Sequence, residues 1–211
     1  GYASYQDVGI FHLREKYLLR GRFYTPNAIQ GDQVVILLSG SGGVAAQYFN
    51  KVIHRYVKRV GVSVLSMDYR GFGGSAGKTP SEQGLFTDAE AMFTYVTDDK
   101  LMGGLETPRR KVVVHGYSLG TGVAAELVRR KPGVAGLILQ CPFTSAAAMA
   151  REGGGVAGAI GGMLADKSAV MDVKGKVSGM SVPILLLIAN QDDRMKAHGD
   201  EISMAMLGKP T

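Results

Sequence analysis

The chain has 211 residues and carries 24 Lys and Arg against 18 Asp and Glu, a formal net charge of +6 at pH 7. Hydrophobic residues make up 45% of the sequence, enough for the buried core of one domain spanning residues 1–211. No apolar run reaches the roughly 18–20 residues that cross a bilayer, so we expect no transmembrane segment. The basic residues are scattered and lack interleaved aromatics, which argues against nucleic-acid binding.

The start of the chain has no basic segment followed by an apolar run, so we expect no signal peptide in this form and a cytoplasmic location. The first residue is Gly1 rather than methionine, which fits a processed protein, a shortened chain or an excised domain. The single cysteine, Cys141, excludes a disulfide framework within the chain. Its position at the end of an apolar run indicates a small core residue rather than a nucleophile.

Apolar runs alternate with amphipathic segments of helical length, which is typical of a parallel sheet covered by helices on both faces. Residues 8–14 and 17–24 predict an opening antiparallel pair. Buried strands are predicted at residues 34–38, 62–67, 111–115, 134–139 and 184–188. Helices are predicted at residues 48–60, 81–96 and 121–130, with Ser81 as the N-cap of the second.

The segment Gly116-Tyr117-Ser118-Leu119-Gly120 lies between a predicted strand and a predicted helix. A serine between two glycines at such a turn exposes a nucleophilic hydroxyl, because a Cβ on either side would crowd the turn. The helix N-terminus would favour the anion formed when Ser118 attacks a carbonyl. The same pattern occurs at Gly73–Gly77, but no helix follows it directly, so Ser75 is predicted to be a serine of a flexible loop.

Three segments together resemble the α/β-hydrolase fold over roughly residues 8–207: Leu37–Gly43, Asp68–Ser75 and the turn at Ser118. The resemblance implies a mostly parallel central sheet with helices on both faces. It also implies an oxyanion hole made by the N–H groups of Leu119 and Ser41, with Gly42 as the alternative to Ser41. Gly42 and Tyr117 would contact the substrate. The chain has Ser39-Gly40 where the family often has His-Gly, a departure that leaves backbone donors unaffected.

The resemblance also implies a catalytic acid after the strand at residues 184–188. The family pattern Gly-x-x-Asp aligns with Asn190–Asp193, so Asp193 is the predicted acid and Asp192 the alternative. Asp68 and Arg70 are expected to shape the backbone near the site rather than take part in chemistry, and the Asp68 carboxylate to be bonded by nearby N–H groups.

The catalytic base has no clear place in the sequence. The four histidines are His12, in the opening strands, His54, on the solvent side of a helix, His115, in the core just before the turn, and His198. His198 follows Asp193 by five residues, where the family begins a helix, so a role in packing or in a site wall competes with that of base. The resemblance implies a further strand, a histidine-bearing loop and a closing helix beyond Thr211.

Three explanations for the missing base are open. The chain is shortened, another segment or chain supplies the base, or the protein is not a working hydrolase. The first would leave an apolar sheet edge uncovered, which would favour self-association.

The Gly/Ala-rich stretch at residues 153–162, within a possible lid or insert at residues 144–175, fits either a mobile flap or a surface connection. The sequence as a whole predicts a serine hydrolase that cleaves an ester or thioester through an acyl-enzyme, on a small-molecule or lipid acyl substrate. The alternatives are a lipase or phospholipase, a peptidase on the same fold, and a non-catalytic binding module. No cofactor or metal site is expected, because no cluster has ligand spacing.

Overall fold

A computed structural model describes residues 4–13, 15–28, 31–41, 49–75, 77–98, 100–101, 111–151 and 171–208. Gly42 and the glycine-rich stretch at residues 153–162, for which the sequence left a flap and a surface connection open, lie outside these ranges.

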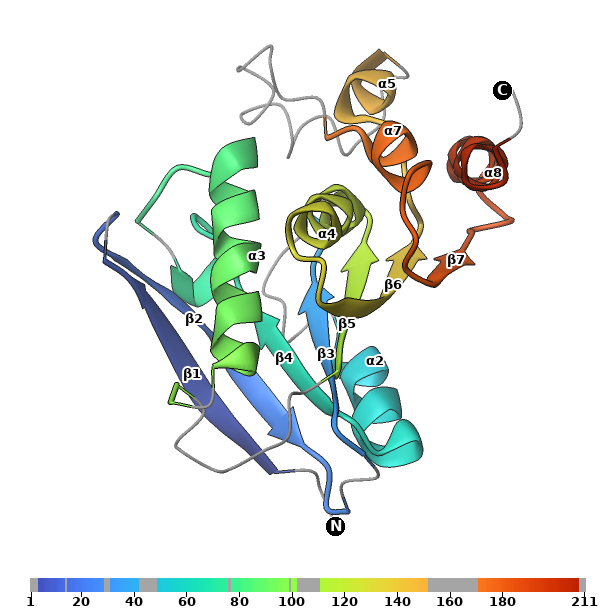
Figure 1. The fold of residues 1–211 in the computed structure, drawn as a ribbon. Coiled ribbons are helices and arrows are strands. Elements are labelled where there is room, and N and C mark those ends of the chain that lie inside the picture. The colour runs from blue at the N-terminus through green and yellow to red at the C-terminus, as the bar shows by residue number, and fades with distance from the viewer. Residues whose placement is uncertain are drawn as a thin grey trace.

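A seven-stranded sheet forms the centre of the described chain, in the order β1-β2-β4-β3-β5-β6-β7 (Figure 1). The strands are β1 (Ser4–His12), β2 (Tyr17–Thr25), β3 (Gln33–Leu38), β4 (Ser63–Met67), β5 (Lys111–Tyr117), β6 (Val134–Gln140) and β7 (Ile184–Leu187). Strands β1 and β2 pair antiparallel, as predicted, and β2 joins β4 antiparallel. The remaining pairs are parallel. The mostly parallel sheet expected from the alternating apolar runs is confirmed.

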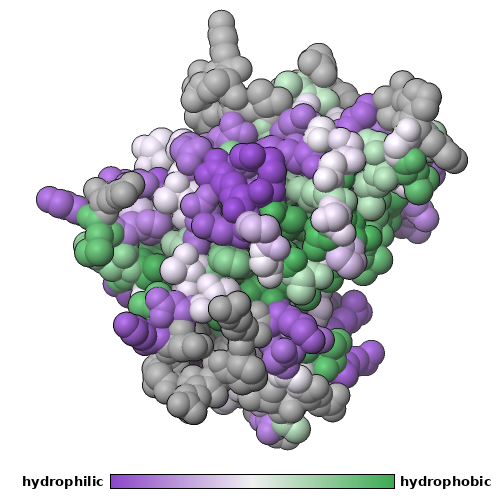
Figure 2. Space-filling model, in the orientation of Figure 1, coloured by the Kyte–Doolittle hydropathy of each residue, from purple (hydrophilic) through white to green (hydrophobic). Residues whose placement is uncertain are grey.

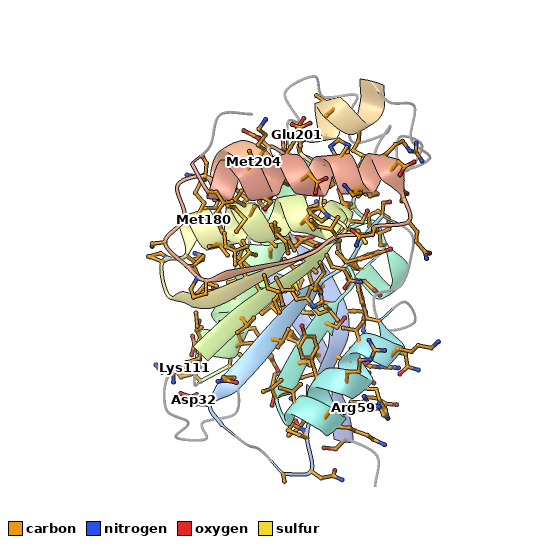
Figure 3. The ribbon with its side chains drawn as sticks, turned by 90° about the vertical axis from the view of Figure 1, so that its right-hand side faces the viewer. Asp32, Arg59, Lys111, Met180, Glu201 and Met204 are labelled. Atoms are coloured by element: carbon orange, nitrogen blue, oxygen red, sulfur yellow. The ribbon has the colours of Figure 1, made fainter. Side chains whose placement is uncertain are left out.

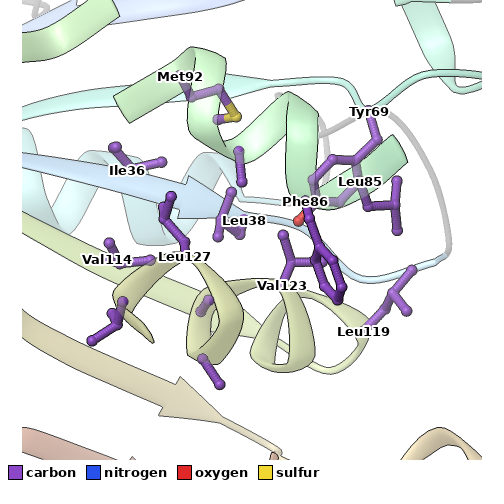
Figure 4. Packing of buried hydrophobic residues seen from close by; sticks show 14 of the residues in the cluster. Ile36, Leu38, Tyr69, Leu85, Phe86, Met92, Val114, Leu119, Val123 and Leu127 are labelled. Atoms are coloured by element: carbon purple, nitrogen blue, oxygen red, sulfur yellow. The ribbon is translucent and has the colours of Figure 1, made fainter. Parts of the chain in front are cut away.

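One face of the sheet is covered by most of the described helices (Figure 1). They are α3 (Glu82–Thr97), α4 (Leu119–Arg130), α5 (Ala146–Arg151), α7 (Val173–Val177) and α8 (Asp193–Met206). Figure 4 shows the packing at its centre, where Leu85 and Phe86 of α3 and Val123 of α4 meet Ile36 and Leu38 of β3. This core fixes the start of α4, and therefore the turn at Ser118, relative to the sheet.

The other face is covered by α2 (Asn50–Arg55), which continues as the π-helical segment η1 (Tyr56–Val60) and ends at Gly61 with φ 74°. Ile53 and Val57 pack there against the sheet residues Val35 and Val64. The sequence predicted one regular helix over residues 48–60. Hydrophobic periodicity does not reveal the wider π turn, because both helix types bury one side.

The predicted cap of α3 is confirmed, since the Ser81 side chain accepts a hydrogen bond from the Gly84 N–H. Three helices of the C-terminal third, α5, α7 and α8, were not predicted from hydrophobic periodicity. The last two follow an aspartate cap: Asp172 caps α7 and Asp192 caps α8. These Asp N-caps were signals that the sequence offered, but the following segments are too short or too polar to show a strong apolar period.

Strand β7 is the last strand on its side of the described sheet. Its Leu185 and Leu187 side chains are 51% and 41% exposed, whereas Ile184 and Leu186 pack against the core. Figure 2 shows a hydrophobic area over this part of the molecule, on the right of the view. Self-association through this edge stays a prediction. Within the described residues, no helix is both long and apolar enough to span a membrane.

Candidate active site

Ser118 occupies a sharp turn between β5 and α4. Its backbone has φ 49° and ψ −117°, a conformation that non-glycine residues rarely adopt. The Ser118 carbonyl accepts hydrogen bonds from the Thr121 N–H (2.8 Å) and the Thr121 hydroxyl (2.6 Å), which hold the turn against its strain. The Ser118 side chain is half-buried, and its hydroxyl makes no hydrogen bond within the described residues. The strained turn therefore presents a hydroxyl that none of the described residues binds.

The two glycines of the motif allow the strand and the helix to approach closely. A Cβ on Gly116 would lie 2.3 Å from the Gly120 carbonyl oxygen, and a Cβ on Gly120 would lie 2.2 Å from the Leu38 carbonyl oxygen. Both contacts are with backbone atoms, which cannot move aside as the end of a flexible side chain could. The requirement for glycine at both positions, inferred from the sequence, has this physical cause.

The loop after β3 lies beside Ser118. A Cβ built on Gly40 would be 3.4 Å from the Ser118 Cβ and 3.3 Å from Cδ1 of Tyr117. Ser41 follows Gly40 and is half-buried, whereas Leu119 is the first residue of α4 and fully buried. The structure thus brings together the two segments predicted to supply oxyanion donors. The alternative donor, Gly42, lies outside the described residues.

The carboxyl ends of β6 and β7 meet the same edge of the sheet. The Ser118 N–H donates to the Gln140 carbonyl (3.0 Å), and the Cys141 N–H donates to the Leu187 carbonyl (2.8 Å). Cys141 also has a left-handed backbone, with φ 49°, and is half-buried. The prediction that Cys141 is a small core residue is therefore wrong: it lies in the turn after β6. Sequence patterning cannot distinguish the last residue of a strand from the first residue of its turn.

Two aspartates follow β7 and occupy different environments. The Asp192 carboxylate caps α8 by accepting from the Arg194 and Met195 N–H groups (both 3.2 Å). Burial and the nearby Asp192 charge raise the pKa of the Cys141 thiol, which places Asp192 on the side of the turn after β6. Asp193, the predicted acid, is exposed in the first turn of α8.

His115 is buried beneath the turn, on the sheet face that α2 covers. Its Nδ1 lies 2.9 Å from the Tyr56 hydroxyl, and its Nε2 lies 3.1 Å from Oε1 of Gln140. Burial lowers the pKa of His115 to about 4, although the bond to Gln140 opposes this shift. A neutral imidazole satisfies both contacts, with Tyr56 donating to Nδ1 and Nε2–H donating to Gln140. The prediction of a core histidine is confirmed.

Tyr56 and Gln140 were missed by sequence reasoning. They matter because Gln140 also accepts the Ser118 N–H through its backbone, so the His115 contacts support the turn from below. Alternation along the strands was an available signal, since His115 and Gln140 fall on the same side as Tyr117.

His198 is buried on α8 and contacts the start of the segment after β6. Its Nδ1 accepts a hydrogen bond from the Thr144 N–H (3.3 Å) and lies 3.0 Å from the Thr144 hydroxyl. When Nδ1 accepts in this way, the proton of a neutral imidazole is on Nε2. A triad histidine has the reverse arrangement, with Nδ1–H donating to the acid. The observed contacts suit packing better than the role of base.

The other two histidines lie where the sequence placed them. His54 is exposed on α2. His12 ends β1 and stacks on Tyr17, with ring centroids 4.6 Å apart. Within the described residues, no group of three or more His, Cys, Asp and Glu side chains is arranged to hold a metal ion.

The second Gly-x-Ser-x-Gly segment is not a flexible loop, so that prediction for Ser75 is wrong. Ser75 is fully buried in a short 3-10 turn, where its hydroxyl donates to the Asp68 carbonyl (2.8 Å) and accepts from the Arg20 N–H (2.8 Å). The Asp68 carboxylate accepts from the Gly74 N–H (2.9 Å), as expected for a buried carboxylate beside backbone donors.

Arg70 is the centre of a buried polar network. Its guanidinium and its backbone N–H bond Asp88, which is fully buried, and the guanidinium also bonds Glu15 and the Tyr17 hydroxyl. Tyr17 in turn donates to Asp88. The prediction that Arg70 has a structural role fits this arrangement, which ties the β1–β2 hairpin to α3.

Comparison with known proteins gives the family. The family described as serine aminopeptidase, S33, matches residues 30–178. A multifunctional-autoprocessing repeats-in-toxin of Vibrio vulnificus is 35% identical over 167 residues, which cover 75% of this chain and 3% of that protein. A lysophosphatidylserine lipase ABHD12 of Danio rerio is 31% identical over 150 residues, which cover 66% of this chain and 37% of that protein.

The chain therefore spans much less than two thirds of these curated relatives. Among solved structures, an alpha-beta hydrolase from Vibrio vulnificus superposes with a TM-score of 0.72 and 29% identity, covering 97% of this chain and 71% of that one. The mostly parallel sheet and the helices on both faces agree with that fold. The chain belongs to the serine aminopeptidase S33 family and has the α/β-hydrolase fold.

Proposed function

We propose that the protein is a serine hydrolase that cleaves an ester or thioester through an acyl-enzyme, with Ser118 as the nucleophile. The observation that carries the proposal is the strained turn at Ser118, which leaves its hydroxyl half-buried and unbonded within the described residues, beside the loop after β3. Strain at a single serine between a strand and a helix is typical of a functional site.

In this mechanism the Ser118 hydroxyl attacks the substrate carbonyl and gives its proton to a histidine. The carbonyl oxygen becomes an anion, which the Leu119 and Ser41 N–H groups stabilise, with Gly42 as the alternative to Ser41. The tetrahedral intermediate collapses to the acyl-enzyme as the C–O or C–S bond breaks, and the protonated histidine gives its proton to the leaving alcohol or thiol. Water then attacks the acyl group, and Ser118 is regenerated. Asp193, or Asp192 in its place, orients the histidine.

Two candidate bases are distinguishable by one variant. One candidate is a histidine that follows Thr211, and the other, within these 211 residues, is His198. Because His198 Nδ1 accepts from the Thr144 N–H, we expect His198→Gln to retain most of the activity of the full-length protein. A loss of several orders of magnitude, with unchanged folding, would assign the base to His198 instead.

The substrate is proposed to be a lipid or another acyl ester. The relative from Danio rerio is named as a lipase, which favours this class, whereas the family description names an aminopeptidase, which favours an amide. Acyl transfer from Ser118 serves both reactions, so the turn itself does not discriminate between them.

The test is labelling of the full-length protein with a fluorophosphonate, followed by hydrolysis of p-nitrophenyl esters of graded chain length, a lysophospholipid and aminoacyl p-nitroanilides. We expect labelling that disappears in Ser118→Ala and persists in Ser75→Ala. Retained labelling in Ser118→Ala would refute the choice of nucleophile. Absence of labelling in the wild type would favour a non-catalytic binding module. Faster cleavage of the anilides than of the esters would favour the peptidase.

A further inference from the structure

The outer side of α2 and η1 carries a cluster of positive charge. Ile53 and Val57 point into the core, while the exposed side chains of the two segments are mostly basic. These exposed basic residues are Lys51, Arg55, Lys58 and Arg59. No Asp or Glu occurs in the sequence from residue 33 to residue 67. Figure 3 shows Arg59 on this helix, at the lower right of the view.

Three of these four cations set the helix apart from the surface around α4. In the described part of the chain, Lys51, Arg55 and Arg59 form no ion pair. Four positive charges on one side of a helix repel one another. This repulsion destabilises the helix unless an anionic partner is bound to it.

The opposite side of the molecule shows a contrast, because several of its cations are paired with carboxylates. Glu126 is 3% exposed and binds Arg129, Arg130 and Lys176, and Lys196 pairs with Asp200. Burial would raise the pKa of Glu126, but the hydrogen bonds from the three cations outweigh it and lower the pKa to about 2. Hydrophilic residues gather in this area at the centre of Figure 2. Here three positive charges neutralise a buried carboxylate, whereas Lys51, Arg55 and Arg59 form no ion pair within the described residues.

The β1–β2 hairpin extends the surface of α2 with aromatic side chains. Tyr24 packs against the same cluster as α2, and its cross-strand partner is Tyr5, so both lie on the α2 side of the sheet. Tyr5 is 55% exposed, and the Arg22 guanidinium lies 4.6 Å from its ring centroid. The carboxylate of Asp7 on this side is paired with Arg22 at 3.1 Å.

We infer that this basic face binds the surface of a membrane that contains anionic phospholipids. The basic face comprises Lys51, Arg55, Lys58 and Arg59 together with Tyr5 and Arg22. Each Lys or Arg near an anionic bilayer adds to its attraction, and an exposed tyrosine suits the headgroup layer. A nucleic acid would meet the same charge, but the basic residues are not interleaved with aromatics along the helix as in a base-stacking surface.

The basic face lies near Ser118, so membrane binding through this face would bring the candidate active site to the lipid surface. Phe49, directly before α2, packs edge-on against Tyr117, with ring centroids 5.8 Å apart, and Tyr117 precedes Ser118. The helix therefore begins next to the candidate active site. The use of this face in lipid hydrolysis rests on the proposed function, whereas the binding itself does not.

The experiment measures co-sedimentation of the full-length protein with vesicles of phosphatidylcholine alone or mixed with phosphatidylserine. Ser118→Ala is present in every sample, so that no lipid is cleaved. We expect binding only to the vesicles with phosphatidylserine, weakened by added salt. Changing all four of Lys51, Arg55, Lys58 and Arg59 to Gln, which keeps helix propensity, should reduce partitioning roughly 100-fold or more. The Tyr5→Ser variant should reduce it by a smaller factor.

A matched control removes four exposed cations elsewhere: Lys78, Lys100, Arg129 and Lys196, each changed to Gln. It has the same net charge as the patch variant and should bind nearly as well as the parent. Equal loss in both variants would mean that only net charge matters and would overturn the inference, as would absence of binding to anionic vesicles. Patch-dependent binding to a single-stranded RNA, with none to vesicles, would also overturn it.

If the fourfold variant does not fold, the pair Arg55→Gln and Arg59→Gln replaces it, with Arg129→Gln and Lys196→Gln as its control. Hydrolysis of a soluble short-chain ester by the protein with Ser118 intact is measured separately. Ester hydrolysis without vesicle binding would refute this inference and leave the proposed function standing.

Discussion

Two segments of the molecule share the pattern Gly-x-Ser-x-Gly, but the serine has a different environment in each. Ser75 is fully buried, and its hydroxyl makes two hydrogen bonds that join β2 to the turn after β4. Ser118 is half-buried, strained and without a hydroxyl bond in the described structure. The two serines differ because different structures surround them. A helix packed on the core holds Ser118 in a strained turn, whereas a short turn folds Ser75 inward, so the motif alone does not decide the outcome.

Substitution of Asp193 and of Asp68 should give the largest contrast, with one variant losing activity and the other losing stability. Asp193→Asn is expected to lower kcat on an ester roughly 10⁴-fold with little change in stability, because Asp193 is exposed and proposed to orient the base. Asp68→Asn should instead reduce stability, since its carboxylate accepts the Gly74 N–H and is 8% exposed. Kinetics and urea denaturation of both variants check this. A loss of activity in Asp192→Asn alone would transfer the role of acid to Asp192.

Substitution of the glycines in the two motifs should give the second largest difference, in the free energy of unfolding. Gly116→Ala and Gly120→Ala should each destabilise the fold by roughly 3 kcal/mol or more, because the added Cβ would meet backbone oxygens at 2.3 and 2.2 Å. Gly77→Ala is the control: its φ of 101° is unfavourable for alanine, but nothing lies within 4 Å, so about 1 kcal/mol is expected. Thermal unfolding measures all three. Equal losses would show that backbone conformation, and not close approach, requires these glycines.

His115 should make the support beneath Ser118 dependent on pH. Its pKa is about 4 in the folded chain and about 6.5 when unfolded, so between these values the unfolded state alone binds the proton. The free energy of unfolding should therefore fall by up to about 3 kcal/mol as the pH drops through this window. His115→Gln should flatten that dependence in urea denaturation.

His12 also has a lowered pKa, from burial, and serves as the comparison. His12→Gln should leave most of the pH dependence in place. If it removed as much as His115→Gln does, the support beneath Ser118 would not be the main titrating element.

Removal of the two serine hydroxyls should give the smallest change in the free energy of unfolding. Ser75→Ala should cost about 1–2 kcal/mol, because it leaves the buried Arg20 N–H without its partner. Ser118→Ala should change stability by less than about 0.5 kcal/mol, since no bond to the hydroxyl is lost in the described structure. Differential scanning calorimetry of the two variants decides. A larger loss in Ser118→Ala would mean that its hydroxyl is part of the structural framework.

Much of the fold could be predicted from the sequence, for reasons visible in particular elements. Strands such as β3 and β4 are continuously buried and therefore read as apolar runs, and Ser81 marked the start of α3. The turns after β4 and β6 were misread at Ser75 and Cys141, because burial there depends on neighbours distant in sequence. The association of Ser118 with the loop after β3 was implied by the family resemblance, and the parallel pairing of β3 with β5 is its structural basis.

The polar support of the site could not be read from the sequence. Tyr56 contacts His115 from the first residue of the π-helical segment, and no residue type signals such a segment. Asp192 caps α8 and Asp193 lies exposed in its first turn, and the role of acid stays a proposal for Asp193, with Asp192 as the alternative.

The order of the sheet has a consequence for how the protein forms during its synthesis. The β1–β2 hairpin leaves the ribosome early, but its neighbour in the sheet, β4, ends about 40 residues later, which takes roughly 2–8 s at typical elongation rates. An isolated two-stranded hairpin is marginally stable. Asp88 is synthesised later still, and it holds the hairpin through its hydrogen bonds with Arg70 and Tyr17. Strands β1 and β2 therefore wait for partners that are made later, and the hairpin is most open to misassembly and proteolysis in that interval.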